Sequence, residues 1–314
     1  MAALRRRFRT AVMLAVTAAL QAPRSRPNAA PRATVAAAET TATDERWPGW
    51  STSVEEDAEL LYMPFLEHQL ALLDKLGAVE EHGALTPELG YATKAKAKTD
   101  GLAARVGSRV FSVPGAFRRV RMTYFDGGHS LQVFNSLWYP ALDRADAPLL
   151  GIDLLRFGPK KFLCVVDAQP PGGRSPDDGS VPHDTSALDA VRGDPKNEEL
   201  RGEVSSKWYD DNRFFSGQML YGRFDRGAEA VDDTLFPAFV DYLDAYVDLV
   251  KTCDVDADGA AAASAAHADY DVFNAARDPA HGLFTSYFGA DWANDFVHDF
   301  LFEQSEAAEE EALS

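Results

Sequence analysis

The residues best suited to acid–base chemistry are Asp153 and Asn135, which stand in the middle of two apolar, strand-like runs, "LLGIDLLRF" (149–157) and "SLQVFNSLWY" (130–139). If the connector between the runs closes symmetrically about Arg144, the two residues pair across neighbouring antiparallel strands and lie on one face. Burial disfavours a charged carboxylate and raises its pKa, so Asp153 is a candidate proton donor. The alternative is a structural pair in which each polar group satisfies the other.

A second carboxyl, Asp278, belongs to the stretch "RDPAHG" (277–282). Pro279 disfavours helix at the residue before it, which places Asp278 at a boundary between a helix and a loop. His281 follows three positions later. From the residues alone, Asp278 is an ordinary turn former and His281 an exposed loop histidine.

The familiar catalytic and cofactor motifs are missing from the sequence. It contains no GxGxxG, no Walker A loop, no GxSxG elbow and no HExxH, and its seven histidines are scattered. Of the two cysteines, Cys164 falls in an apolar strand pattern and is interpreted as a small buried hydrophobic residue. The sequence therefore gives no sign of a metal site or of a nicotinamide or flavin cofactor bound by a standard loop.

The elements around these residues predict an antiparallel sheet between helices. Four strand-like runs with short, turn-rich connectors indicate a meander, at 117–125, 130–139, 149–157 and 160–168. Helical spacing is seen at 54–76 (with Pro64 as a break or a start), 236–253, 264–277 and 291–302. Residues 171–205 are expected to form a long loop. Because the strands are apolar on both faces, we expect an α/β fold, a three-layer α/β/α sandwich.

Length and composition indicate one globular domain. The chain has 314 residues, of which 46% are hydrophobic and 11% aromatic. We expect a single domain at 45–303, an acidic tail at 304–314, and no transmembrane helix.

The first 44 residues are expected to be a targeting leader. An arginine-rich start and a short apolar run resemble a secretory signal, and the Ala-, Pro-, Ser- and Arg-rich stretch that follows resembles a transit peptide. This combination predicts a plastid of secondary origin; a plain leader or a single transit peptide is the alternative. Removing the seven leader arginines from the total charge of −18 leaves −25 for residues 39–314, which argues against nucleic acid or an anionic membrane as partner.

Three blocks of the sequence together resemble the ferredoxin-dependent bilin reductases. They are "SVPGAFRRVRMTYFDGGHSLQVFNSLWYP", "LLGIDLLRFGPKKFLCVVDAQP" and "RDPAHGLFTSYFGADWANDFVHDFLF". The resemblance covers roughly residues 108–170 and 264–303, and it implies the same α/β/α sandwich.

Within the family, the blocks look most like the members that reduce biliverdin IXα to 15,16-dihydrobiliverdin, a step towards phycoerythrobilin. Phycocyanobilin-forming relatives have a histidine in place of Asn135 and a glutamate in place of Thr123, so both positions argue against that product. The members that form dihydrobiliverdin are expected to have an aspartate where this chain has His129. The position falls in a turn, so we interpret the difference as surface variation. A sibling regiospecificity, such as phycoerythrobilin synthase or dihydrobiliverdin reductase, and a non-catalytic bilin carrier remain the alternatives.

The resemblance also implies roles for individual residues. Asp153 becomes the central proton donor and Asp278 the second carboxyl of a radical mechanism, while Asn135, His281 and Arg156 are expected to contact the bilin.

The implied electron donor is reduced [2Fe–2S] ferredoxin, with no cofactor bound to the chain itself. Ferredoxin is acidic, so a local basic patch is needed to dock it. The candidates are Arg118, Arg119, Arg121, Lys160, Lys161 and the run Lys94–Lys98, with ordinary surface charge as the alternative for each. We expect a monomer, with the next bilin reductase as a further candidate partner.

Overall fold

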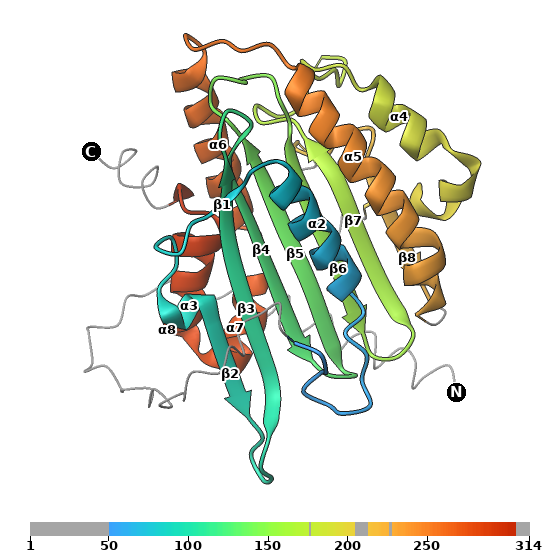
Figure 1. Ribbon diagram of the computed structural model, residues 1–314, viewed down its shortest axis with the longest axis vertical. Helices are drawn as coiled ribbons and strands as arrows, with labels where there is room; N and C mark the ends of the chain where they lie inside the picture. Colours follow the sequence, from blue (N-terminus) through green and yellow to red (C-terminus); the bar gives the residue numbers. More distant parts are fainter. Residues whose placement is uncertain (1–49, 176, 205–212, 226–227, 306–314) are drawn as a thin grey trace.

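The computed structural model describes residues 50–175, 177–204, 213–225 and 228–305, so the predicted leader (1–44) and most of the predicted tail lie outside the described residues. Its centre is an antiparallel eight-stranded sheet in the order β1-β3-β4-β5-β6-β7-β8, with β2 also paired to β3 (Figure 1). The strands are β1 (Val79–Glu80), β2 (Tyr91–Ala95), β3 (Leu102–Val113), β4 (Phe117–Gly127), β5 (Leu131–Pro140), β6 (Leu149–Phe157), β7 (Lys161–Gln169) and β8 (Leu220–Phe224).

The meander predicted from four apolar runs is confirmed as β4 to β7. Its tight turns use Gly128 and Gly158, whose φ angles of 65° and 66° favour glycine. The register of β5 and β6 places Asn135 opposite Asp153, which confirms the predicted pairing.

The remaining strands were not predicted. The longest of them, β3, alternates polar and apolar residues without a continuous apolar run. Its arginines have partners: Arg105 bonds to Asp126 at 3.1 Å, and Arg109 bonds to Glu80 with its Nε at 2.7 Å. Because these charges are paired with carboxylates on the neighbouring strands β4 and β1, a sequence that looks like a solvated loop forms a twelve-residue strand.

Two helical layers cover the sheet, which confirms the predicted α/β/α sandwich (Figure 1). One layer contains α2 (Met63–Lys75), α4 (Ser186–Gly193) and α5 (Phe236–Thr252), with the 3₁₀ helix η1 (Pro195–Leu200) and the π-helical turn η2 (Val231–Leu235). The other contains α3 (Pro87–Gly90), α6 (Ala260–Ala275), α7 (Ala280–Phe288), α8 (Ala290–Asp295) and the π-helical turn η3 (Phe296–Leu301).

Several predicted boundaries are wrong. The helix expected from residue 54 begins only at Met63, because Pro64 suits a first helical turn and lacks the N–H that a helix interior needs. The expected loop at 171–205 contains α4 and η1. The helix α7 begins directly after Pro279, where a loop was expected.

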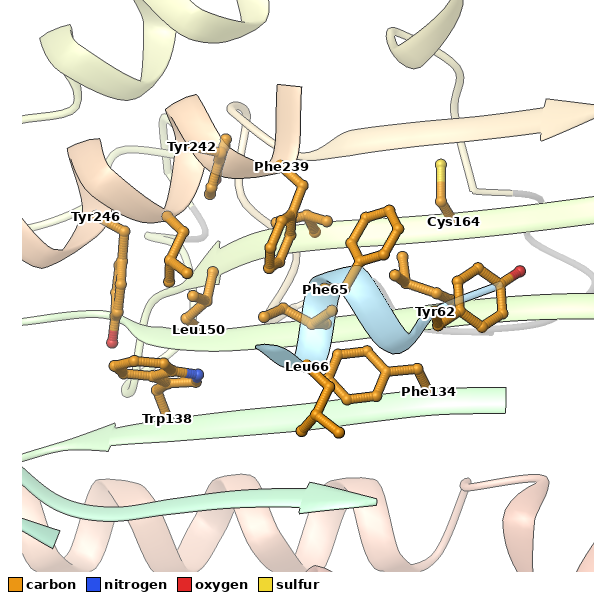
Figure 2. Packing of buried hydrophobic residues seen from close by; sticks show 14 of the residues in the cluster. Tyr62, Phe65, Leu66, Phe134, Trp138, Leu150, Cys164, Phe239, Tyr242 and Tyr246 are labelled. Atoms are coloured by element: carbon orange, nitrogen blue, oxygen red, sulfur yellow. The ribbon is translucent and has the colours of Figure 1, made fainter. Parts of the chain in front are cut away.

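The face of the sheet towards α2 and α5 forms a closed hydrophobic core. Figure 2 shows Phe65 of α2 and Phe239 of α5 packed over Phe134, and Cys164 is buried among them as predicted. Gln69 of α2 is a buried polar residue of this core whose side-chain oxygen has two partners. Gln69 Oε1 accepts hydrogen bonds from the Ser136 hydroxyl at 2.9 Å and from the Trp138 indole N–H at 2.8 Å.

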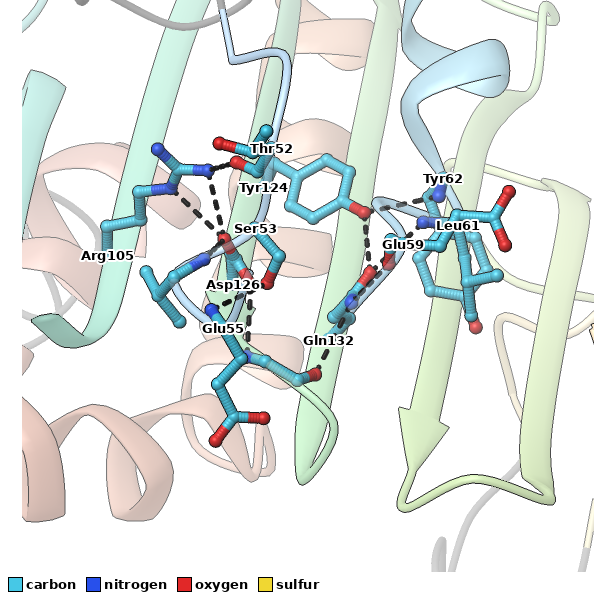
Figure 3. A network of polar contacts seen from close by, with 12 residues as sticks. Thr52, Ser53, Glu55, Glu59, Leu61, Tyr62, Arg105, Tyr124, Asp126 and Gln132 are labelled. Carbon is cyan, nitrogen blue, oxygen red and sulfur yellow. Dashed lines mark hydrogen bonds and ion pairs between the residues drawn. The ribbon is translucent and has the colours of Figure 1, made fainter. Parts of the chain in front are cut away.

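Residues 50–62, which we call the N-terminal strap, cross the end of the sheet and are held by a polar network (Figure 3). The carboxylate of Asp126 accepts from the Ser53 hydroxyl at 2.6 Å and from the Val54 amide at 2.9 Å. The Tyr124 hydroxyl accepts from the Tyr62 amide at 3.2 Å. This face is therefore closed along its length, which leaves the opposite face for chemistry.

Candidate functional site

Asp153 and Asn135 lie on the face of the sheet that α6, α7 and η3 cover. The amide of Asn135 donates from Nδ2 to Asp153 Oδ1 at 2.7 Å. Strand alternation puts both side chains on this face, while their neighbours Phe134 and Leu154 enter the closed core on the other side. Both residues are partly accessible, so the pair lies at an apolar surface that is not fully closed.

The pair is continued by Arg121 of β4. Its Nη1 donates to Asn135 Oδ1, and its Nε donates to the carbonyl of Leu301 at 2.8 Å. The guanidinium is only 2% exposed and lies near the rings of Phe300 and Phe302. A buried chain of donors therefore runs from Arg121 through Asn135 to Asp153.

The surroundings raise the pKa of Asp153 to about 7. Burial is the largest cause, and the charge of Asp278 adds to it; the hydrogen bond from Asn135 and the charge of Arg121 act in the opposite direction. A carboxyl with this pKa keeps a substantial protonated fraction near neutral pH. It can therefore act as a general acid.

Asp278 reaches the site from the turn between α6 and α7. Its Oδ1 accepts from the Ala280 amide at 2.7 Å, so it orders the start of α7 as a turn former would. Burial raises its pKa, opposed by that hydrogen bond and by the charge of Arg121. The fold thus brings the two predicted carboxyls together from opposite layers.

Two other buried carboxyls, Asp167 and Asp271, have pKa values raised to about 6, again chiefly by burial. Their oxygens are used by other groups: Asp167 accepts from the Ser216 amide at 3.0 Å and hydroxyl at 2.5 Å, and Asp271 from the Tyr139 hydroxyl at 2.6 Å. Both residues are fully buried, whereas Asp153 is partly accessible. Asp153 is therefore the better placed to meet a substrate.

The sheet around the pair is apolar and only half covered. The half-buried members of this face share aliphatic side chains on three adjacent strands; they are Leu131, Val133, Leu155, Leu163 and Val165. Half-buried aromatic side chains, Phe273 and Tyr287 among them, belong to the helices above. Such a lining suits a flat, largely apolar molecule and keeps water from the carboxyls.

Arg156 does not join this site, and its predicted contact with the substrate is wrong. As an even-numbered neighbour of Asp153 on β6, it points to the opposite face of the sheet. There its guanidinium donates to the Gly158 carbonyl at 3.0 Å and lies 3.3 Å from His129 Nδ1.

His281 lies exposed in the first turn of α7, three residues after Asp278. Its predicted contact with the substrate stays a prediction.

The predicted basic docking residues divide into buried and exposed groups. Arg119 is 4% exposed and bonds to Glu303 at 3.1 Å, and Arg118 is half-buried and bonds to the same carboxylate at 2.9 Å. Because a docking partner needs accessible charge, the prediction is wrong for Arg119. Lys160 and Lys161, at the turn between β6 and β7, are exposed and stay candidates.

Arg121 was expected at a docking surface rather than at the carboxyl pair. In the sequence, Arg121 lies two residues from both Arg119 and Thr123 on an apolar strand. This spacing predicts that all three side chains lie on the face of the sheet that carries Asn135.

In the described ranges, no group of three or more His, Cys, Asp or Glu side chains is placed to hold a metal ion. The same residues include no helix long and apolar enough to cross a membrane.

Comparisons with known proteins show the family of this chain. A model of the family described as ferredoxin-dependent bilin reductase matches residues 78–303. The 15,16-dihydrobiliverdin:ferredoxin oxidoreductase of Gloeobacter violaceus is 39% identical over 78% of this chain and 96% of its own. The protein of that name from Synechococcus sp. strain WH7803 is 40% identical, over 64% of this chain and 84% of its own.

Among solved structures, phytochromobilin synthase from tomato in complex with biliverdin has a similar fold. The TM-score is 0.64 at 20% identity, and the match covers 78% of this chain and 84% of that chain.

Proposed function

Because this chain belongs to the ferredoxin-dependent bilin reductase family, we propose that it reduces biliverdin IXα to 15,16-dihydrobiliverdin. As a member of the family it is an oxidoreductase that takes electrons from ferredoxin and binds no cofactor of its own. The choice of product is supported by relatives that carry the name 15,16-dihydrobiliverdin:ferredoxin oxidoreductase and align over most of their length.

The proposed reaction consumes two electrons and two protons. Each reduced [2Fe–2S] ferredoxin supplies one electron, so the bilin passes through a radical between the two transfers. The double bond between C15 and C16 becomes a single bond, and each of these carbons gains one hydrogen. The chain's own task is therefore to bind the bilin, exclude water and deliver protons.

The observation that carries this proposal is the pair Asp153 and Asp278 on a half-covered apolar face. Asp153, with its pKa raised to about 7, serves as the central proton donor. After donation its carboxylate keeps the hydrogen bond from Asn135, which stabilises the charged form until a proton returns. Asp278 is the second carboxyl, and its charge keeps the pKa of Asp153 high.

The test is an anaerobic reaction of the full chain with biliverdin, ferredoxin and a ferredoxin-reducing system. We expect the absorbance to shift to the blue as conjugation shortens, and chromatography to identify 15,16-dihydrobiliverdin. If chromatography identifies a different reduced bilin, the chain has the regiospecificity of another member of the family. A tight complex that ferredoxin does not reduce would favour a bilin carrier.

The role of Asp153 is tested by Asp153→Asn in the same assay. We expect biliverdin still to bind and turnover to stall at a coloured radical, because the electron arrives without its proton. Ile152→Val, a non-titrating change on the same strand whose side chain enters the closed core on the other face, is the control and should retain most of the activity. Wild-type turnover in Asp153→Asn would remove this residue from the mechanism.

Two further proposals concern the surroundings of the enzyme. The exposed Lys160 and Lys161 are proposed to meet ferredoxin, and replacing both with glutamate should raise the KM for ferredoxin without changing the affinity for biliverdin. The leader composition supports delivery to a plastid, which the location of a fluorescent protein fused to residues 1–44 would test.

A further inference from the structure

We propose that Arg121 is a positioning residue for the proton donor: by fixing the amide of Asn135, it confines the transferable proton to Oδ2 of Asp153. This inference rests on the proposed function of Asp153 as a general acid. It concerns a residue that need not touch the substrate, because it acts through Asn135.

The first step is the orientation of the Asn135 amide. A guanidinium carries only donors, so the atom of Asn135 that faces Arg121 must be the carbonyl Oδ1. The flipped amide would set an NH₂ group against the N–H groups of Arg121, with no acceptor between them. Arg121 thereby directs Nδ2 towards Asp153, at 2.7 Å from Oδ1.

The second step is the position of the proton on Asp153. Oδ1 already accepts a hydrogen bond from Nδ2 of Asn135, and a proton on Oδ1 would meet another donor there. The proton is consequently held on Oδ2. One defined oxygen then gives up the proton, and the other keeps its hydrogen bond before and after the transfer.

The third step is the rigidity of Arg121 itself. Its Nε donates to the Leu301 carbonyl at the end of η3, and the rings of Phe300 and Phe302 lie 5.9 Å and 5.4 Å from the guanidinium carbon. A planar guanidinium held at two edges has little freedom to turn. The orientation of Asn135 is therefore set by a group anchored in the helical layer opposite the sheet.

Charge supports the same conclusion. In the described part of the chain, the charged groups that act on Asp153 are Asp278, from the turn before α7, and Arg121, from β4. The neighbouring strand β7 places the apolar Val165 opposite Asp153. Arg121 lowers the pKa of both carboxyls, so removing its charge should raise both.

The experiment titrates the aspartate carboxyls by ¹³C NMR in the full chain without bilin, with Asp153→Asn to assign the signal. Arg121→Gln loses the charge and allows the amide to flip, and we expect the pKa of Asp153 to rise by about one unit. Arg121→Lys keeps the charge and should shift it by less than half as much. A titration in Arg121→Gln that matches wild type would overturn the proposal.

Arg119→Gln is the matched control. Arg119 lies on the same face of β4 and also bonds to η3, through the Phe300 carbonyl at 2.8 Å. Unlike Arg121, it does not contact Asn135. We expect its Asp153 titration to match wild type. An equal shift in this control would assign the effect to a loosened helical layer and overturn the role of Arg121.

If Arg121→Gln does not fold, Asn135→Ala tests the same chain of contacts while leaving Arg121 bonded to Leu301. It should also raise the pKa of Asp153, and an unchanged value would again overturn the proposal. The titration contains neither biliverdin nor ferredoxin, so its result does not depend on the proposed function. If the pKa shift is seen but the chain reduces no bilin, the positioning role of Arg121 stands and the proposed reaction is wrong.

Discussion

Replacing Asp153 with asparagine should stabilise the protein, and more so at alkaline pH. In the folded chain the pKa of this carboxyl is raised from 3.8 to about 7. Well below pH 3.8 the group is protonated in both states and the substitution removes no charge. As the pH rises from 4 to 7, only the unfolded chain releases the proton, so the wild-type protein loses stability.

The size of the effect follows from the size of the shift. One pKa unit corresponds to about 1.4 kcal/mol, so ionised Asp153 destabilises the folded state by about 4 kcal/mol above pH 7. Between pH 6 and pH 8.5 roughly 1.4 kcal/mol of this penalty develops. Asparagine does not titrate, so the difference in free energy of unfolding between variant and wild type should grow by that amount.

Urea unfolding at pH 6, 7 and 8.5, at constant ionic strength, measures this difference. A constant change in hydrogen bonding, such as a new contact between the amide side chains at 153 and 135, contributes equally at each pH and cancels. Ile152→Val should differ from wild type by the same amount at each pH. If the advantage of Asp153→Asn were constant or shrank with rising pH, the raised pKa and the reasoning from it would be refuted.

Three further substitutions test other parts of the structure. Gln69→Leu leaves the Trp138 indole N–H without its acceptor and should lower the free energy of unfolding by about 2 kcal/mol in urea; a loss below about 0.5 kcal/mol would contradict the hydrogen bond. Gly151→Ala places a methyl group 2.9 Å from a glutamine oxygen on β7 and should cost about 1 kcal/mol by the same measurement, whereas unchanged stability would show that the glutamine moves freely. Asp278→Asn removes a like charge, so the pKa of Asp153 should fall. Turnover should then decline at a lower pH than in the wild-type protein. An unchanged midpoint in the pH–rate profile would show that the charge of Asp278 does not act on Asp153.

The pairing of the site could be predicted from sequence because it depends on local rules. Alternation assigns Asn135 and Asp153 to faces, and a short connector limits the register to values near the symmetrical one. The approach of Asp278 from the other layer did not follow from these rules. It came from the resemblance to a family.

Arg121 and Arg119 show why the rest could not be predicted. The local sequence does not show whether a pair of arginines on a strand is exposed to solvent or buried. Arg119 donates to the carbonyl of Phe300, 181 positions further along the chain, and Arg121 to that of Leu301, 180 positions further along. Long-range hydrogen bonds of this kind leave no periodic signal, so the arginines were assigned to the surface.

The strand β3 and the helix α7 were missed for a related reason. Contacts with other elements stabilise both: the arginines of β3 pair with carboxylates on neighbouring strands, and Asp278, in the turn before α7, accepts a hydrogen bond from the Ala280 amide. Local propensity describes such segments poorly, because tertiary contacts decide them.

The contact between Arg121 and Leu301 also joins the surroundings of the proposed proton donor to a late part of the chain. The β4–β7 meander, residues 117–169, leaves the ribosome well before η3, so the sheet can pair and begin to bury its first face while the second is still uncovered. Contacts this distant in sequence form late, because the entropy cost of closing a long loop must be met before the contact is made. The guanidinium gains its anchor, and the proton donor its final surroundings, only when the last described turn has been made. The surroundings that raise the pKa of Asp153 are therefore among the last parts of the described fold to form.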